Sequence, residues 1–243
     1  MENEEKRLPE GKLPQGIKAA LIDMDGVLYD SMPFHARSWH QLFLDLGVEN
    51  SNPDEYYLYE GMKGSDTIGL ILKRELNRDT TEEERISIYS QKTELFKHCG
   101  EAPKMPGAPE MLEALKSLGL NTVLVTGSGQ PSLLDKINKD YPGFFPKERM
   151  VTAFDVKNGK PHPEPYLRGL EKAGVEASQA IVIENAPLGV RAGKAAGLFT
   201  IAVTTGPIPR EVFVTEGADL IFPDMPSFAR WLSKESPTFL KKD

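Results

Sequence analysis

The sequence predicts an α/β protein, built as a doubly wound parallel sheet with a helical unit inserted after its first strand. Two patterns predict this class. Beyond residue 100, short apolar runs alternate with helical stretches, and such alternation is typical of a parallel sheet covered by helices on both faces. Between residues 36 and 96, helical patterns recur without a strong strand candidate. We therefore expect a sheet domain that is interrupted by a separate group of helices.

The first strand is expected at residues 17–22, where the run IKAALI ends at Asp23. The helical unit follows, with helix-start signals in the segments NPDE and SDTI and in a capping box of Thr81 and Glu84. These signals predict about four helices. The segment GEAPKMPGAPE, which is rich in Gly and Pro, marks the far edge of the unit.

The later elements alternate regularly. Their strands are short runs of β-branched and aliphatic residues, as expected for strands buried on both faces. The predicted strands are 122–126, 150–154, 180–184, 199–203 and 219–222, and the predicted helices are 109–118, 131–139, 164–173, 187–196, 209–216 and a last one from about 226. The resulting domain division is a disordered tail at 1–16, a core domain at 17–32 and 100–243, and a helical cap domain at 33–99.

Composition limits the function. The chain has 243 residues, of which 40% are hydrophobic and 27% charged, as in ordinary globular proteins. A net charge of −7 argues against a general nucleic-acid binder or a binder of anionic membranes. The single cysteine, Cys99, excludes an intramolecular disulfide. Because the N-terminal segment is charged and no apolar run reaches membrane-spanning length, we expect a cytoplasmic protein. An acidic surface and a mobile cap favour a monomer.

Polar side chains follow the predicted strands where those strands end. They are Asp23 and Asp25, Thr126, Lys160, and the pair Glu184 and Asn185. Ligands of open α/β sheets bind beyond the carboxyl ends of the strands. Carboxylates, a hydroxyl and an ammonium group meeting there suit a phosphoryl group with Mg²⁺, a hard cation that prefers oxygen ligands. Taken alone, a DxD pair is more often a solvated turn, and a lone lysine is usually solvated.

The segments DMDGVLYDS, VTGS, GKPHPEPY and VIENAPLGVRAG resemble, in this order, the four motifs of the haloacid dehalogenase superfamily. Any one motif is weak, but four in order at strand ends are specific. The helical insertion is similar to the cap of the β-phosphoglucomutase-like branch. The resemblance implies a Rossmann-like core and a four-helix cap that closes over the site.

The resemblance also implies roles for individual residues. Asp23 would be the nucleophile that forms an aspartyl-phosphate, and Asp25 the general acid and base. Thr126 and Lys160 would bind the transferring phosphoryl group, helped by Gly127 and Ser128 and by Gly26, whose lack of a side chain lets the chain pass close to it. Mg²⁺ would be held by the Asp23 carboxylate, the Asp25 backbone carbonyl, and Glu184 and Asn185 of the fourth motif.

Departures from the family pattern narrow the activity. Asp25 argues against dehalogenases and phosphonate hydrolases, so a phosphatase or a phosphomutase remains. Lys63 matches a cap lysine of the β-phosphoglucomutases. Those enzymes have cationic residues for a second phosphate at two further positions, where this sequence has Thr67 and Gly129. A mutase is therefore disfavoured. His35 matches a histidine of the mutase hinge, and an ordinary polar hinge residue is an equal interpretation.

The acidic cap residue Glu60 suggests a substrate. Asn185 replaces a carboxylate that is common in the family, and Glu60 lies on a stretch expected to face the core. This pattern resembles members that hydrolyse inorganic pyrophosphate, so our hypothesis is that Glu60 approaches Mg²⁺ and shrinks the pocket around a small leaving group. A solvated glutamate at a helix end is the simpler alternative. The other functions considered are a β-phosphoglucomutase, a sugar-phosphate phosphatase, and a non-enzymatic module that binds phosphorylated ligands or resembles a receiver domain.

Overall fold

The computed structural model describes residues 9–128 and 131–239 and contains one parallel sheet of six strands in the order β3-β2-β1-β4-β5-β6. This is the strand order of a doubly wound Rossmann-like fold, so the predicted fold class is confirmed. The strands are β1 Ala19–Ile22, β2 Asn121–Val125, β3 Met150–Val151, β4 Ala180–Glu184, β5 Phe199–Val203 and β6 Leu220–Phe222.

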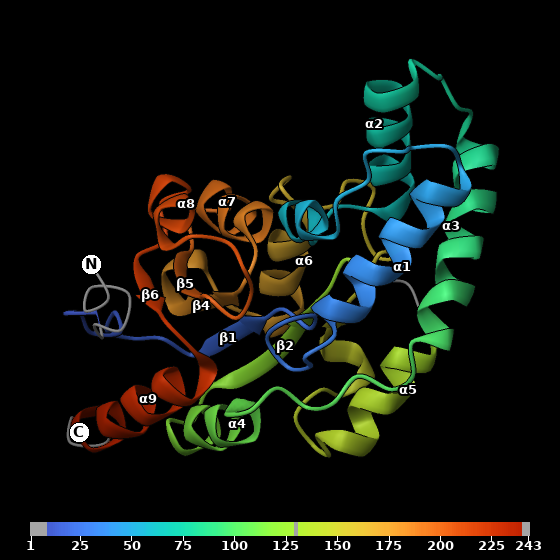
Figure 1. Cartoon of the computed structure of the whole chain (residues 1–243). Helices are drawn as coiled ribbons and strands as arrows, with labels where there is room; N and C mark the ends of the chain where they lie inside the picture. The colour runs from blue at the N-terminus through green and yellow to red at the C-terminus, as the bar shows by residue number, and fades with distance from the viewer. Residues whose placement is uncertain (1–8, 129–130, 240–243) are drawn as a thin grey trace.

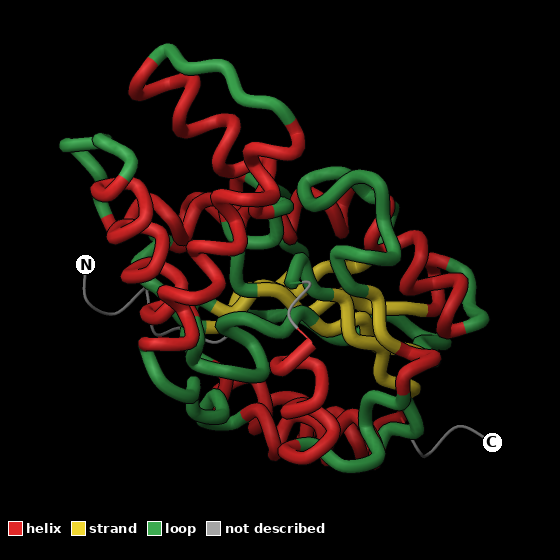
Figure 2. Tube along the Cα trace, turned by 90° about the vertical axis from the view of Figure 1, so that its right-hand side faces the viewer, coloured by secondary structure: helices red, strands yellow, loops and turns green. Residues whose placement is uncertain are grey.

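Helices cover both faces of the sheet (Figures 1 and 2). One face carries α4, α5 and α9, and the other carries α6, α7 and α8. Their bounds are α4 Ala108–Ser117, α5 Pro131–Asp140, α6 Glu164–Ala173, α7 Pro187–Ala195, α8 Arg210–Thr215 and α9 Met225–Phe239.

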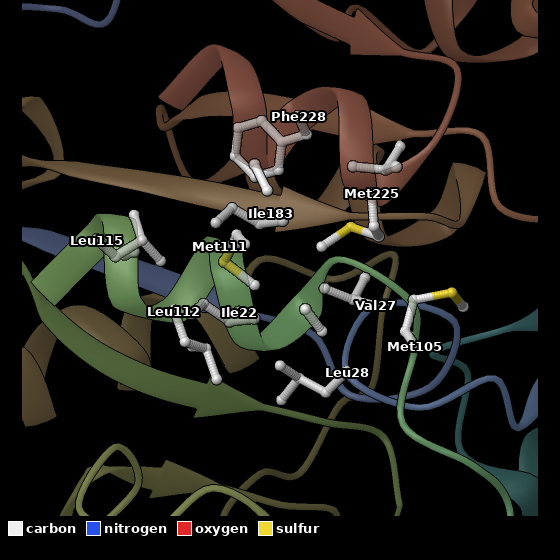
Figure 3. Close-up of a cluster of buried hydrophobic side chains, with 14 of the residues drawn as sticks. Ile22, Val27, Leu28, Met105, Met111, Leu112, Leu115, Ile183, Met225 and Phe228 are labelled. Atoms are coloured by element: carbon white, nitrogen blue, oxygen red, sulfur yellow. The ribbon is translucent and has the colours of Figure 1, made fainter. Parts of the chain in front are cut away.

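The core between the sheet and its first helical layer is formed by segments that are far apart in the sequence. Figure 3 shows Met111 and Leu115 of α4 facing Phe228 of α9, with Ile22 of β1 and Ile183 of β4 beside them. Alternate residues of each central strand enter this cluster, and the residues between them enter the cluster under α6 and α7. Such two-sided burial explains why these strands are continuously apolar in sequence.

The inserted unit has an apolar cluster of its own. It consists of α1 Met32–Asp45, the 3₁₀ helix η1 Pro53–Tyr59, α2 Gly64–Leu76 and α3 Glu82–His98, which lie together to one side of the sheet (Figure 1). Trp39, Phe43, Tyr56 and Ile68 are among the buried residues of this cluster. The predicted helix starts at Asn52 and Thr81 form as expected, because each side chain accepts a backbone N–H of the first turn. One of the four predicted helices is a 3₁₀ helix.

Several predicted bounds shift by one or two residues, and two larger differences concern the third strand and the N-terminal segment. The strand expected at 150–154 ends at Val151, because the N–H of Thr152 donates to Asp155 Oδ2 at 2.8 Å and the chain turns away from the sheet. The predicted disordered tail ends earlier than residue 16, since Leu13 is buried in the cluster beneath the sheet. Residues 1–8 of that tail lie outside the described residues. Within the described ranges, no helix is both long and apolar enough to cross a membrane.

Candidate active site

The ends of β1 and β4 meet where the strand order of the sheet reverses, and this is where ligands bind in doubly wound folds. Asp23 follows β1 directly, and its backbone N–H donates to the carbonyl oxygen of Ile183 in β4 at 3.0 Å. Glu184 is the last residue of β4. Both carboxylates are buried, so their charges must be compensated inside the protein.

Lys160 supplies that compensation. Its buried ammonium group donates to Asp23 Oδ1, to Glu184 Oε1 at 2.6 Å and to the carbonyl oxygen of Val125 at 3.1 Å. An ammonium group has three N–H donors, so all of them have protein partners. Burial alone would lower the pKa of Lys160, but the charges of Asp23 and Glu184 outweigh it and raise that pKa above its usual range. Lys160 is therefore charged.

The carboxylate of Glu184 is also fully hydrogen-bonded. Its Oε1 accepts Lys160 Nζ at 2.6 Å and the hydroxyl of Tyr166 at 2.7 Å, and its Oε2 accepts the backbone N–H groups of Asn185 at 3.0 Å and Ala186 at 3.2 Å. A carboxylate has about four lone-pair sites. Its role as a direct metal ligand stays a prediction, and this arrangement does not favour it.

Two buried oxygens next to this cluster have no hydrogen-bond partner: Asp23 Oδ2 and Asn185 Oδ1. Buried polar atoms are almost always paired. Two unpaired oxygens at one edge of the sheet therefore indicate a site where a bound cation would be their partner. In the part of the chain that the structure describes, no group of three or more His, Cys, Asp or Glu side chains is arranged to hold a metal. A cation bound by one carboxylate with amide and backbone oxygens fits Mg²⁺, which takes only one or two protein carboxylates.

Gly26 makes room for Asn185. Its φ is +81°, in the left-handed region that favours glycine, and a Cβ at this position would lie 1.9 Å from Asn185 Nδ2. The amide that carries the unpaired oxygen thus packs directly against the backbone of Gly26. The sequence predicted that Gly26 lets the chain pass near a phosphoryl group, and the neighbour that the structure shows is Asn185.

Asp25 is held by two residues at the entrance to the cap. Its Oδ1 accepts Ser31 Oγ at 2.6 Å and lies 3.2 Å from His35 Nε2. Burial by itself would raise the pKa of Asp25, but His35, Ser31 and Lys92 together outweigh it and lower that pKa. An ionised Asp25 is in the state that a general base requires.

Lys92 of α3 extends this chain of contacts into the cap. Its buried Nζ lies 2.6 Å from His35 Nδ1 and about 5 Å from the ring centroids of Trp39 and Phe96. An ammonium group can only donate, so His35 Nδ1 accepts and His35 Nε2 carries the proton donated to Asp25. Burial and Lys92 lower the pKa of His35, which keeps the imidazole neutral. Burial lowers the pKa of Lys92 to about 8.

The cap covers a small cavity over Asp25. Its volume is about 30 Å³, whereas ligand pockets usually measure about 300–1,000 Å³. Glu60, Trp39 and Tyr89 line it from the cap side, and Ser128 from the core side. Further lining residues from the hinge, the cap and the core include His35, Tyr56, Tyr59, Thr67, Lys92 and Gly127. Burial, and then the charges of Asp25 and Asp23, raise the pKa of Glu60 well above its usual range. Glu60 lines the same cavity as Asp25, and its approach to Mg²⁺ stays a prediction.

Glycines allow the close contact between cap and core. The backbone of Gly61, at φ +84°, lies against Lys160, whose Cδ would be 2.6 Å from a Cβ at residue 61. A Cβ at Gly127 would lie 2.9 Å from the carbonyl oxygen of Gly61. Lys63 donates to the carbonyl oxygen of Lys157 at 2.7 Å. In this arrangement Lys63 joins the cap to the core and does not line the cavity, so its substrate-binding role stays a prediction.

The loop after β2 contributes Thr126, Gly127 and Ser128. Thr126 is buried, and its Oγ1 accepts the backbone N–H of Ser128 at 3.0 Å. This bond shapes the loop so that Gly127 and Ser128 face the cavity. Their predicted role in binding a phosphoryl group fits this position, while Gly129, discussed for a second phosphate, lies outside the described residues.

The structure thus brings most of the predicted residues together at one edge of the sheet, with Lys63 as an exception, and adds three that the sequence reasoning missed. Ser31 lies in the predicted hinge and could have been found from its nearness to Asp25. Tyr166 stands within the segment GKPHPEPY, but its hydroxyl gives no sequence signal. Lys92 lies in a highly charged helix, where a lysine is indistinguishable from its solvated neighbours.

Comparison with known proteins identifies relatives of this chain. The family of haloacid dehalogenase-like hydrolases matches residues 17–197. Glycerol-1-phosphate phosphohydrolase 2 of Saccharomyces cerevisiae is 32% identical over 196 residues, which cover 78% of this chain and 75% of the yeast protein. Hexitol phosphatase A of Escherichia coli is 30% identical over 187 residues, which cover 76% of this chain and 82% of that enzyme.

Solved structures show the same fold over nearly the whole chain. A protein from Bacteroides vulgatus, provisionally named a β-phosphoglucomutase, is 52% identical with a TM-score of 0.86, covering 93% of this chain and 91% of its own. The relatives named by substrate act on phosphorylated polyols and sugars, and none of those cited here is named for pyrophosphate. These names support the sugar-phosphate alternative better than the pyrophosphate hypothesis.

Proposed function

This chain belongs to the haloacid dehalogenase-like hydrolases, and from that membership we propose that it is a Mg²⁺-dependent phosphatase acting on a small phosphorylated sugar or polyol. The observation that carries the proposal is the pair Asp23 and Asp25 in one buried site, in which the first is held by a lysine and the second by a hinge histidine. That arrangement provides a nucleophile and a separate proton-transfer group, which two-step phosphoryl transfer requires.

In the first step, Asp23 attacks phosphorus, the bond from phosphorus to the leaving oxygen breaks, and Asp25 gives that oxygen a proton. This step requires the protonated form of Asp25, which the ionised carboxylate of the free enzyme reaches by taking a proton from solvent. In the second step, Asp25 takes a proton from water, which displaces Asp23 and releases phosphate. Lys160 holds Asp23 by its Oδ1 and leaves Oδ2 unpaired. Ser31 and His35 fix the orientation of Asp25 throughout.

Mg²⁺ would be held by Asp23 Oδ2 and Asn185 Oδ1, the two unpaired buried oxygens, with the backbone carbonyl of Asp25 as the further expected ligand. When bound, it offsets the repulsion between the carboxylate and the phosphoryl oxygens.

The substrate class rests on the relatives and on the lining of the cavity. Aromatic rings of Trp39, Tyr56, Tyr59 and Tyr89 border it beside the hydroxyl of Thr67. Such rings offer large amphipathic surfaces to a small carbohydrate. The names of the relatives point to phosphorylated polyols and sugars. A β-phosphoglucomutase remains less favoured, because Thr67 supplies no charge for a second phosphate.

Pyrophosphate is a second candidate, which two specific observations favour. Glu60 lines the cavity together with Asp25, and the cavity volume of about 30 Å³ leaves little room for a hexose. An additional carboxylate near the metal and a short leaving group would suit an inorganic substrate.

The deciding experiment measures kcat/KM with glycerol phosphate, hexitol phosphates, hexose phosphates, pyrophosphate and nucleotides, each with Mg²⁺ and with EDTA. We expect a sugar or polyol phosphate to give the highest value, and EDTA to abolish phosphate release. Asp23→Asn should lower kcat on the order of 10⁴-fold while the fold is kept. A higher kcat/KM for pyrophosphate that falls in Glu60→Gln would select the second candidate. Interconversion of glucose phosphates without phosphate release would contradict both.

A further inference from the structure

The buried tyrosine Tyr166 contacts both members of the pair formed by Lys160 and Glu184. Its hydroxyl donates to Glu184 Oε1 at 2.7 Å, and the Nζ of Lys160 lies 5.1 Å from the centroid of its ring. The residue comes from α6, and its side chain is 0% exposed. A hydroxyl in such a place needs a partner, and the one it has is a carboxylate of the active site.

Glu184 is fixed from every side by these contacts. Tyr166 and Lys160 occupy Oε1, while two backbone N–H groups at the start of α7 occupy Oε2. Gly189 of α7 closes the remaining approach, because a Cβ there would lie 1.8 Å from Oε1. With all four lone-pair sites in use, the carboxylate has no free oxygen for a cation. The neighbouring oxygens Asp23 Oδ2 and Asn185 Oδ1 have no hydrogen-bond partner and are free to bind a cation.

We propose that Tyr166 is a positioning residue: it holds Glu184 on Lys160, so that Glu184 orients the lysine and the nucleophile Asp23 and does not bind the metal. This inference rests on the proposed Mg²⁺-dependent phosphatase. The two neighbouring residues then have different roles. Asn185 binds the cation, and Glu184 orients Lys160.

Metal affinity tests the role of Glu184 without reference to turnover. Titration calorimetry with Mg²⁺ alone is carried out on the wild type, Glu184→Gln and Asn185→Leu. We expect the dissociation constant of Glu184→Gln to stay within about threefold of the wild type, and that of Asn185→Leu to rise at least about tenfold. An equal loss of affinity in the two variants would overturn the proposal, because Glu184 would then be a ligand.

Turnover tests the role of Tyr166. Tyr166→Phe keeps the ring and removes only the hydroxyl. Tyr141→Phe is its matched control, since the buried hydroxyl of Tyr141 donates to the backbone carbonyl oxygen of Leu28 instead of a side chain of the site. We expect Tyr166→Phe to lower kcat about 10–100-fold with KM and Mg²⁺ affinity nearly unchanged, and Tyr141→Phe to leave kcat unchanged.

Equal kcat values in the two tyrosine variants would overturn the positioning role, and this comparison decides the matter if Glu184→Gln does not fold. A wild type that binds Mg²⁺ but releases no phosphate from any substrate contradicts the proposed function alone, because the Mg²⁺ affinities of the variants still decide the role of Glu184.

Discussion

At the residue scale, Lys92 is an ammonium group that is buried in the cap and connected through His35 to Asp25, the proposed general acid and base. The Nζ of Lys92 lies 2.6 Å from His35 Nδ1, and His35 Nε2 lies 3.2 Å from Asp25 Oδ1. Because burial lowers its pKa to about 8, Lys92 loses its proton in a range where enzymes are assayed. The neutral amine can accept a hydrogen bond as well as donate one, so it no longer fixes the imidazole tautomer.

We therefore predict that kcat of the wild type decreases as the pH rises above about 8. Lys92→Met should lower kcat about tenfold or more at neutral pH and remove this decrease, because no proton remains to be lost. The measurement is a profile of kcat against pH from about 6 to 10. Lys97→Met is the control, since Lys97 is an exposed lysine of the same helix. An unchanged alkaline limb in Lys92→Met would contradict the prediction.

The lowered pKa of Lys92 also makes the free energy of unfolding depend on pH. The pKa of Lys92 is lowered in the folded protein from 10.5 to about 8, so between these values the unfolded chain binds the proton more tightly. Its contribution to the free energy of unfolding therefore increases with pH across that window. Activity and stability should respond to this one group in opposite directions, which distinguishes it from general alkaline unfolding.

Residues of the site differ in how well a sequence can predict them. Asp23 and Asp25 are one residue apart in a single motif, Glu184 ends β4 and Lys160 follows β3, so the topology alone brings them together. Lys92 reaches the site only through the packing of α3 on α1, which no local pattern encodes. The hydrogen bonds of Glu184 likewise depend on side-chain geometry. Its proposed role therefore could not be predicted from its position in a motif.

At the element scale, the turn after η1 closes the cavity by backbone contact, and its conformation depends on glycine. Gly61 has φ +84° and touches Lys160. Most element bounds follow from the apolar pattern, and the segments 164–173, 180–184 and 199–203 agree with α6, β4 and β5 at both ends. The contact of this turn with the core loops depends instead on where the cap comes to rest, and the sequence pattern carries no signal of that.

We predict that Gly61→Ala lowers kcat/KM at least about tenfold, because its Cβ would meet Lys160 Cδ at 2.6 Å and keep the cap from closing. The matched control is Gly143→Ala, since Gly143 has φ +83° and no neighbour within 4 Å of an added Cβ. Both variants should lose about 1–2 kcal/mol of stability from left-handed backbone strain. Steady-state kinetics with urea unfolding separates the two effects, and equal kcat/KM values in the two variants would contradict the steric argument.

At the scale of the whole molecule, the cap has an apolar cluster of its own, separate from the clusters of the core domain. The cap cluster contains Trp39 stacked on Phe43 with their ring centroids 5.6 Å apart. The core cluster has Trp231 packed against it, 6.3 Å from Phe228 between ring centroids. These are the two tryptophans of the sequence, so each reports on one cluster. Units with separate cores need not unfold together.

The final prediction uses this division. Phe43→Ala and Phe228→Ala each remove a fully buried ring, at a cost of about 3–5 kcal/mol. Unfolding in urea is followed by fluorescence in the single-tryptophan variants Trp39→Phe and Trp231→Phe. We expect Phe43→Ala to lower the midpoint reported by Trp39 more than that reported by Trp231, and Phe228→Ala to lower chiefly the Trp231 midpoint. Coincident shifts would contradict the prediction, because they would mean that cap and core unfold as one cooperative unit.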